Sequence, residues 1–286
     1  MHGAPEHLNT ADDSWARVED SWTADWNPRL VAFDLDDTLA PSKSPVEQPM
    51  LDALRALLGL VEVCVISGGQ ISQFRLQLVD RLDDADGALL RRLHLMPTCG
   101  TQYWRYDGSG WRQEYAENLT ESEIDAALAS LTARAKELDL WEQKTWGPIL
   151  ENRGSQVTFS ALGQAAPVDA KRAWDPTGEK KGALRAAVAR DLPDLEVRSG
   201  GSTSIDITRR GIDKAYGIRK LVTLTGMNVD EMLFVGDRLD RDGNDFPVKA
   251  TGIRCHAVQG WEETADLIRR IVSACSAASA EPAFRH

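Results

Sequence analysis

The chain has 286 residues and a formal net charge of −11, from 33 basic and 44 acidic residues. Its apolar share of 42% suffices for a packed core, whereas its acidic balance argues against a nucleic-acid partner or an anionic membrane surface. The acidic N-terminal region contains no apolar signal segment, and no stretch reaches the length of a membrane span. We therefore expect a soluble cytoplasmic protein of one or two domains.

Residues 1–27 are polar and acidic, and we expect them to form an N-terminal extension. The extension contains Trp15, Trp22 and Trp26, whose spacing places them on one face of a short helix. An ordered extension that packs on the body of the protein through these rings is the simplest prediction.

An apolar run at residues 30–33 predicts a short strand that is buried on both faces. Three carboxylates follow closely, at Asp34, Asp36 and Asp37. Carboxylates clustered at the end of a buried strand repel one another, so this arrangement favours a cation among them. Mg²⁺ is the hard cation that best suits a phosphate partner. A simple turn or a helix cap is the alternative interpretation.

The next segments continue an alternation of helices and strands. A helix is expected at 47–58, and an apolar strand at 61–66 ends in Ser67 and Gly68, followed by a second glycine. A hydroxyl followed by two glycines lets the backbone approach an anion closely. A further strand is expected at 93–96.

The pattern changes at residue 104, and we expect residues 104–208 to form a separate α+β unit inserted between the two parts of a core, 28–103 and 209–286. Two helices and several short strands are predicted in the unit. The helices open at the capping box 120–123 and at Asp175, and the strands are expected at 155–162, 195–197 and 203–208, after a turn at 107–110.

After this unit, Lys214 opens a helix, and an apolar strand at 232–235 ends in Gly236 and Asp237. The loop that follows is rich in Asp and ends at Asp245. The last predicted elements are a strand at 252–258, a helix at 262–272, and a frayed tail from Ser273.

Four of these segments, in this order, resemble the motifs of the haloacid dehalogenase (HAD) superfamily. The motifs are Asp-x-Asp-x-Thr at 34–38, Ser-Gly-Gly at 67–69, Gly-Ile-Asp-Lys at 211–214, and Gly-Asp with Asn-Asp at 236–245. The resemblance implies an α/β fold, with a Rossmann-like core around a parallel sheet and an inserted α+β cap of the C2B type. It also implies that Asp34 is a nucleophile and Asp36 an acid and base, while Ser67 and Lys214 hold the transferring phosphoryl group.

The same resemblance implies Mg²⁺ as the cofactor, with Asp34, Asp36, Asp237 and Asp245 as its ligands. Asp240 and Asp242 are expected to be solvated. Asp34, Ser67, Lys214 and Asp237 lie far apart in the sequence, and they can converge only if four strand ends line one edge of a parallel sheet. A carboxylate nucleophile forms an aspartyl-phosphate and so splits one hard displacement into two easier ones.

Within the superfamily, the chain resembles the eukaryotic-type phosphomannomutases over the core and most of the cap. The matching segments are 151–154, 160–163, 199–201, 204–206 and 243–246. This likeness implies that Gly68 lies beside the substrate, and that Arg153, Ser204 and Asp206 contact the distal end of a sugar phosphate. A salt bridge within the cap is the alternative for Arg153 and Asp206.

Three positions depart from the mutase pattern. Lys43, Gln164 and Lys171 stand where the family has Arg, although the neighbouring Arg172 could take the place of the third Arg. Neither Lys nor Gln replaces a bidentate Arg in holding a distal phosphate. We therefore expect a Mg²⁺-dependent phosphatase that hydrolyses a sugar phosphate or similar small phosphomonoester. A phosphomannomutase is the alternative, and an inactive sugar-phosphate binding protein is a third hypothesis. A homodimer is left open.

Overall fold

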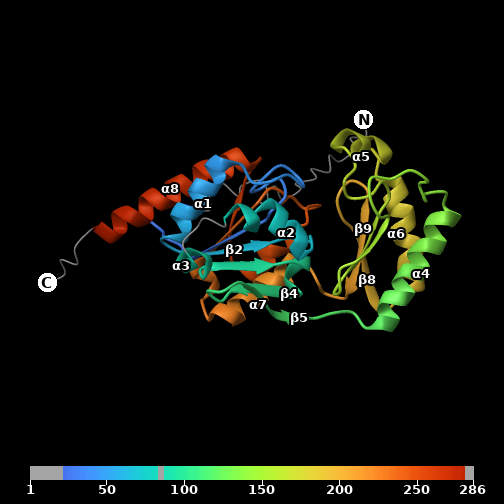
Figure 1. The fold of residues 1–286 in the computed structure, drawn as a ribbon, viewed down its shortest axis with the longest axis horizontal. Helices are drawn as coiled ribbons and strands as arrows, with labels where there is room; N and C mark the ends of the chain where they lie inside the picture. The colour runs from blue at the N-terminus through green and yellow to red at the C-terminus, as the bar shows by residue number, and fades with distance from the viewer. Residues whose placement is uncertain (1–21, 83–86, 281–286) are drawn as a thin grey trace, which may run out of the picture.

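The structure is a computed structural model that describes residues 22–82 and 87–280. The chain forms a larger core and a smaller cap, each with its own sheet, and crosses between them twice (Figure 1). Trp15 lies outside the described residues. The described part of the N-terminal extension starts at Trp22 and is not helical.

Seven strands form the sheet at the centre of the core. The first four neighbouring pairs in sheet order are parallel, and the last two are antiparallel. In sheet order, the strands are β11 (Arg254–Ala257), β10 (Met232–Gly236), β1 (Leu30–Phe33), β2 (Glu62–Ile66), β3 (Leu93–Met96), β4 (Gln102–Tyr106) and β5 (Trp111–Ala116). Because parallel strands end at the same edge of a sheet, the segments that follow β1, β2 and β10 meet there.

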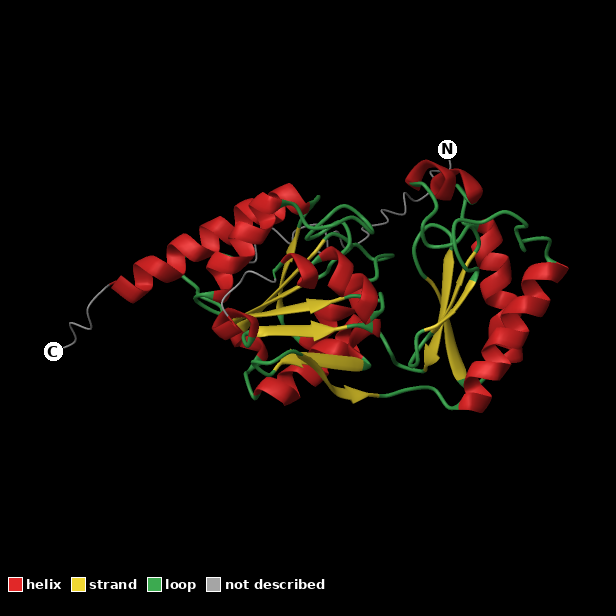
Figure 2. Cartoon of the chain, viewed as in Figure 1, coloured by secondary structure: helices red, strands yellow, loops and turns green. Residues whose placement is uncertain are grey.

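Helices cover both faces of this sheet (Figure 2). The core helices are α1 (Gln48–Leu58), α2 (Ile71–Gln77), α3 (Gly87–Leu90), α7 (Lys214–Thr225) and α8 (Trp261–Ala280). Short 3₁₀ turns lie at Val79–Arg81, Thr98–Gly100, Val229–Glu231 and Phe246–Thr251.

The residues of β1 show why this part of the sequence is continuously apolar. Leu30 and Ala32 pack in the cluster that includes residues of α7, whereas Val31 and Phe33 pack in the cluster that includes residues of α1 and α8. All four are fully buried. Successive residues of a strand point to opposite faces, so a strand covered on both faces must be apolar throughout. The expected doubly buried strand is confirmed.

The cap is a four-stranded antiparallel sheet with helices on its outer face. Figure 1 shows α4 and α6 covering the face that is turned away from the core, with α5 at one end. The cap elements are β6 (Leu150–Asn152), β7 (Val157–Ser160), β9 (Ser204–Arg209), β8 (Leu195–Ser199), α4 (Glu121–Glu137), α5 (Val168–Trp174) and α6 (Glu179–Asp191). The predicted capping box is present, because Thr120 and Glu123 bond reciprocally at the start of α4.

The predicted start of the cap at residue 104 falls inside the core sheet. The hairpin of β4 and β5, which turns at residues 107–110, pairs with β3 and extends the core sheet to Ala116. A hairpin sequence specifies its own turn, but it does not specify which sheet its outer edge joins.

Two further local expectations need correction. Asp175 does not open a helix directly; it follows α5, and its carboxylate accepts bonds from the backbone of Lys180 and Lys181 at the start of α6. The tail from Ser273 is not frayed within the described residues, since α8 continues to Ala280. Alanine is the best helix former, which favours this continuation.

Two tryptophans of the N-terminal segment pack on the core as expected. Trp22 is buried, with the Arg270 guanidinium 5.2 Å from its ring centroid, and the Arg254 guanidinium lies 4.4 Å from that of Trp26. Within residues 22–82 and 87–280, no helix combines the length and the apolar character that crossing a bilayer requires.

Candidate active site

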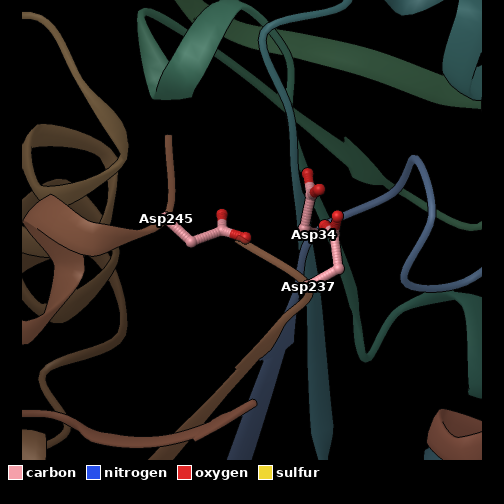
Figure 3. A group of neighbouring side chains, drawn as sticks. All are labelled: Asp34, Asp237 and Asp245. Carbon is pink, nitrogen blue, oxygen red and sulfur yellow. The ribbon is translucent and has the colours of Figure 1, made fainter. Parts of the chain in front are cut away.

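Three carboxylates meet at the edge of the core sheet where the parallel strands end. Asp34 follows β1, Asp237 follows β10, and Asp245 lies at the end of the next loop. One oxygen of each lies within 4.8 Å of the others, and Figure 3 shows Asp245 pointing toward the other two side chains. Three of the four predicted metal ligands are thus brought together.

Lys214, the first residue of α7, lies between two of these carboxylates. Its Nζ atom is 2.6 Å from Asp34 Oδ1 and 2.5 Å from Asp245 Oδ1, and its side chain is only 1% exposed. Asp213 fixes the start of the helix by accepting a bond from the backbone of Tyr216. Burial alone would lower the pKa of Lys214, but the charges of Asp245 and Asp34 outweigh it and raise that pKa. The lysine is therefore a cation.

The cluster still carries more negative charge than Lys214 balances. Burial raises the pKa of Asp34 well above its ordinary value, although the charge of Lys214 opposes that rise. Burial, followed by the charge of Asp245, raises the pKa of Asp237. A divalent cation would offset this repulsion, and the oxygen donors are those that Mg²⁺ prefers. The residues present therefore fit a bound Mg²⁺.

Thr38 and Arg238 orient two of these carboxylates. The Thr38 hydroxyl donates to Asp237 Oδ1 at 3.2 Å and accepts from the Asp237 backbone at 3.1 Å. The backbone N–H of Arg238 donates to Asp245 Oδ2 at 3.1 Å. Thr38 had no predicted role, although its place in the Asp-x-Asp-x-Thr motif was a signal.

Asp36 is the predicted metal ligand that the structure places apart from this cluster. Its carboxylate accepts bonds from Lys43 Nζ and the Lys43 backbone, both at 2.8 Å, and from Gln73 Nε2 at 2.9 Å. Burial raises the pKa of Asp36, but the charge and hydrogen bonds of Lys43 outweigh burial and hold it below its ordinary value. Lys43 therefore compensates the negative charge of this carboxylate.

Two glutamines of α2 belong to the site and were missed from the sequence. Gln73 also accepts a bond from Lys43 Nζ at 2.7 Å, and Gln77 donates to Asp36 Oδ1 at 3.3 Å. Residues four apart lie on the same face of a helix, so the spacing of these two amides was the available signal.

Ser67 is buried at the end of β2, next to β1 in the sheet. Its hydroxyl accepts a bond from the Gly69 backbone at 3.2 Å. The cap reaches this loop through Arg153, whose Nη1 donates to the Gly68 carbonyl at 3.0 Å. Arg153 also pairs with Glu151 at 2.6 Å, so the alternative salt bridge within the cap is present as well.

Ser204 and Asp206 lie together on β9. Asp206 accepts hydrogen bonds from Gln156 at 2.8 Å and from the Thr158 hydroxyl at 2.7 Å. A Cβ atom placed on Gly200 would lie 2.6 Å from Ser204 Oγ and 2.7 Å from Asp206 Oδ2, so this glycine leaves room for both side chains. Within the described residues, the partners of Asp206 are polar cap groups rather than a salt bridge.

Lys171 and Gln164 lie on the cap side of the site. Lys171 Nζ donates to the Gln164 carbonyl at 2.7 Å. Burial and then the positive charge of Lys43 lower the pKa of Lys171, while the charge of Asp36 opposes this. The cap lysine therefore lies within electrostatic range of the core residues Lys43 and Asp36.

Comparison with known proteins identifies the family of this chain. A family model described as eukaryotic phosphomannomutase matches residues 50–274. The chain belongs to this family. It is 24% identical to the phosphomannomutase of Saccharomyces cerevisiae, over 85% of this chain and 93% of the yeast protein. It is 26% identical to the phosphomannomutase of Schizosaccharomyces pombe, over 77% of this chain and 84% of that protein.

Solved structures support the fold. A haloacid dehalogenase-like hydrolase from Bacteroides thetaiotaomicron aligns with a TM-score of 0.57 at 16% identity, over 86% of this chain and all of that one. The N-terminally truncated IMP-nucleotidase of Plasmodium falciparum aligns with a TM-score of 0.63 at 12% identity, over 87% and 71% of the two chains. The α/β fold and the HAD superfamily are confirmed, and the protein is an enzyme of that superfamily.

The match to the family model begins after the first motif. Asp34 and Asp36 precede residue 50, whereas Lys214, Asp237 and Asp245 lie inside the matched range. The structure joins the two groups, because Lys214 contacts Asp34 directly.

Proposed function

We propose that the protein is a Mg²⁺-dependent phosphomannomutase that interconverts mannose 1-phosphate and mannose 6-phosphate. The match of residues 50–274 to the eukaryotic phosphomannomutase model carries this proposal, and the yeast relatives bear the same name. The comparisons therefore favour the alternative from the sequence analysis over its first choice, a generic phosphatase. A cytoplasmic location and a homodimer stay predictions.

In this proposal, Asp34 is the nucleophile. One of its carboxylate oxygens attacks phosphorus, the bond from phosphorus to the donor oxygen breaks, and an aspartyl-phosphate forms. Lys214, which lies 2.6 Å from Asp34, compensates the negative charge of the transferring group, and the Ser67 hydroxyl donates a hydrogen bond to that group. Bound Mg²⁺ supplies charge neutralisation at Asp34, Asp237 and Asp245.

Asp36 acts as the acid and base. It gives a proton to the leaving oxygen and takes one from the sugar hydroxyl that then receives the phosphoryl group. The contact of Asp36 with Lys43, at 2.8 Å, must loosen when Lys43 turns to an anionic substrate. Release of that contact would favour the protonated carboxyl that an acid catalyst requires.

Lys43 and Lys171 are the proposed cations for the phosphate that does not react. They lie on opposite sides of the boundary between core and cap, within electrostatic range of each other. Both ammonium groups are compact point charges, so they attract a phosphate without the bidentate geometry of Arg. The neutral Gln164 favours a sugar-phosphate phosphatase as the second candidate, because a weaker grip on the distal phosphate lets water compete with the sugar.

One ³¹P NMR time course separates these functions. The enzyme is mixed with mannose 1-phosphate, Mg²⁺ and a trace of glucose 1,6-bisphosphate as activator. Growth of mannose 6-phosphate supports the mutase, whereas release of inorganic phosphate without that isomer supports the phosphatase. An unchanged spectrum contradicts both for this sugar. Turnover of p-nitrophenyl phosphate in parallel shows whether the enzyme is active at all.

A further inference from the structure

Three buried hydroxyl groups form a closed ring where the cap meets the core. Thr98 and Thr101 come from the turn between β3 and β4, and Ser155 comes from the cap loop between β6 and β7. The oxygen–oxygen distances are 2.7 Å between the two threonines, 2.6 Å from Thr101 to Ser155, and 3.0 Å from Ser155 to Thr98. Their exposed fractions are 0%, 2% and 2%.

The ring satisfies its own hydrogen bonds. In one arrangement, Thr101 donates to Ser155, Ser155 to Thr98, and Thr98 back to Thr101, so that each hydroxyl donates once and accepts once. The Thr98 backbone carbonyl, 2.8 Å from the Thr101 hydroxyl, is a second acceptor for the single Thr101 proton. Bonds arranged in such a cycle strengthen one another in a buried site. Removal of the Ser155 hydroxyl takes away the donor to the Thr98 hydroxyl, which is costly where water cannot replace it, whereas Thr101 can still donate to the Thr98 carbonyl.

The core side of the ring is joined to the Ser67 loop. The backbone of Thr98 donates to the Gly69 carbonyl at 2.9 Å, and the backbone of Cys99 donates to the Ser67 carbonyl at 2.9 Å. Thr98 and Cys99 both have positive φ, at 49° and 56°. A β-branched residue rarely adopts this conformation, so the surrounding contacts must hold the turn in place.

The cap side of the ring is joined to Arg153. The Gln102 side chain donates to the Arg153 carbonyl at 2.9 Å, which fixes the backbone two residues before Ser155. The Arg153 side chain is 7% exposed and reaches across to the Gly68 carbonyl at 3.0 Å. Thr98 of the ring and the Arg153 side chain therefore both contact the Ser67–Gly69 loop of the core, one from the core and the other from the cap.

We propose that Ser155 is a positioning residue, which acts through Thr98 and Thr101 to hold Arg153 against the Ser67–Gly69 loop. Arg153 is then already in place when substrate arrives, so binding does not have to order it. The inference rests on the proposed function, because a phosphomannomutase is expected, from the family resemblance, to contact the distal end of its sugar phosphate through Arg153. It predicts that loss of the ring weakens binding of a sugar phosphate more than binding of a phosphate ester without a sugar.

Ser155→Ala tests this prediction. We expect KM for mannose 1-phosphate to rise about tenfold with kcat changed less than about twofold, as for loss of about one hydrogen bond in binding. KM for p-nitrophenyl phosphate should be unchanged, and Ser155→Thr, which keeps the hydroxyl, should restore most of the loss. Ser130→Ala is the matched control, because it removes another buried cap hydroxyl, one that donates to Asp191 at 2.7 Å.

Hydrogen exchange provides a readout that does not depend on the sugar. In Ser155→Ala, the backbone amides of Thr98 and Cys99 should exchange at least about tenfold faster than in the wild-type protein, and Ser130→Ala should leave them unchanged. Unchanged exchange in Ser155→Ala would overturn the proposal, and so would an equal rise of KM for both phosphate esters. If mannose 1-phosphate is not turned over but exchange rises, the proposed function fails while the role of the ring in holding the junction stands.

Discussion

The charge balance of the active site depends on Lys214. Its ammonium group is buried between Asp34 and Asp245, so both carboxylates rely on it for compensation where water is excluded. The pair at Asp36 and Lys43 is a second, separate unit of compensation. Charge at this site is therefore divided between a nucleophile cluster and an acid–base pair.

Replacement of the nucleophile tests the first of these units. Asp34→Asn keeps the size of the side chain but removes the attacking oxygen anion, so we expect turnover of every phosphate ester to fall at least about a thousandfold. Steady-state rates with p-nitrophenyl phosphate and Mg²⁺ measure the effect. Asp240→Asn is the control, since Asp240 is exposed and pairs with Arg238 at 2.8 Å. Full activity in Asp34→Asn would contradict the mechanism.

Removal of the compensating cation tests stability. Lys214→Met leaves two buried carboxylates unpaired, so we expect the free energy of unfolding to fall by about 3–5 kcal/mol in the presence of a chelator. Added Mg²⁺ should restore part of this loss, because a cation would replace the missing positive charge. Urea unfolding with chelator and with Mg²⁺ provides the measurement, and equal midpoints for wild type and variant would count against the charge balance.

Close packing at the element scale brings helix α7 to the active site. Gly217 lies in the first turns of α7, and a Cβ atom there would lie 2.7 Å from the Cys99 carbonyl oxygen. The glycine thus lets the helix approach the turn between β3 and β4. Because Lys214 is on the same helix, this close approach also positions its ammonium group between Asp34 and Asp245.

A pair of helical glycines separates this packing effect from helix propensity. Gly217→Ala should destabilise the protein by about 1–3 kcal/mol through overpacking. Gly182→Ala in α6 meets open space, so the better helix propensity of Ala should stabilise the protein by about 0.5–1 kcal/mol. Thermal unfolding of both variants is the measurement. Stabilisation of both variants would show that packing at Gly217 is unimportant.

Glu123, at the start of helix α4, makes the stability of the folded protein depend on pH. A hydrogen bond from Arg209, followed by one from the Thr120 backbone, lowers the pKa of Glu123 to about 2. The folded protein thus binds fewer protons at this site than the unfolded chain, so the stabilisation is present above about pH 4.5 and is lost as the pH falls toward 2. Wild type should exceed Glu123→Gln in melting temperature at pH 7, and the gap should close near pH 2–3.

At the scale of the whole molecule, the N-terminal segment is part of the core. Trp22 is 2% exposed and belongs to the cluster that includes β1, α1 and α8. Its ring therefore connects the start of the described chain to the last helix. This packing supports the face of the sheet that α1 and α8 cover, and with it the strand ends that form the active site.

The contribution of this segment can be measured with two tryptophans. Trp22→Ala should lower the free energy of unfolding by about 3–5 kcal/mol, as for other buried aromatic side chains. Trp146→Ala should change it by less than about 1 kcal/mol, because Trp146 is 46% exposed. Chemical denaturation followed by circular dichroism gives both values. A Trp22 variant as stable as the wild type would mean that the segment does not support the core.

Local pattern predicted the strands β1, β2, β3 and β10 to within one residue at each end, and it predicted the residues at their carboxyl ends. A buried parallel strand must be apolar along its length, so its position can be read without knowledge of its neighbours. The convergence of Asp34, Lys214, Asp237 and Asp245 followed from the same topology. The family resemblance then provided the roles that spacing alone cannot assign.

Tertiary structure alone decided which partners each element and charge would find. It placed the β4–β5 hairpin in the core sheet, paired Asp36 with Lys43 and Gln73 instead of the metal cluster, and joined Ser155 to Thr98 and Thr101. Sequence patterns report local spacing and burial, whereas strand partners and charge partners depend on contacts between residues that are distant along the chain. Those contacts form only when the whole chain has folded, so they could not be derived from any one segment.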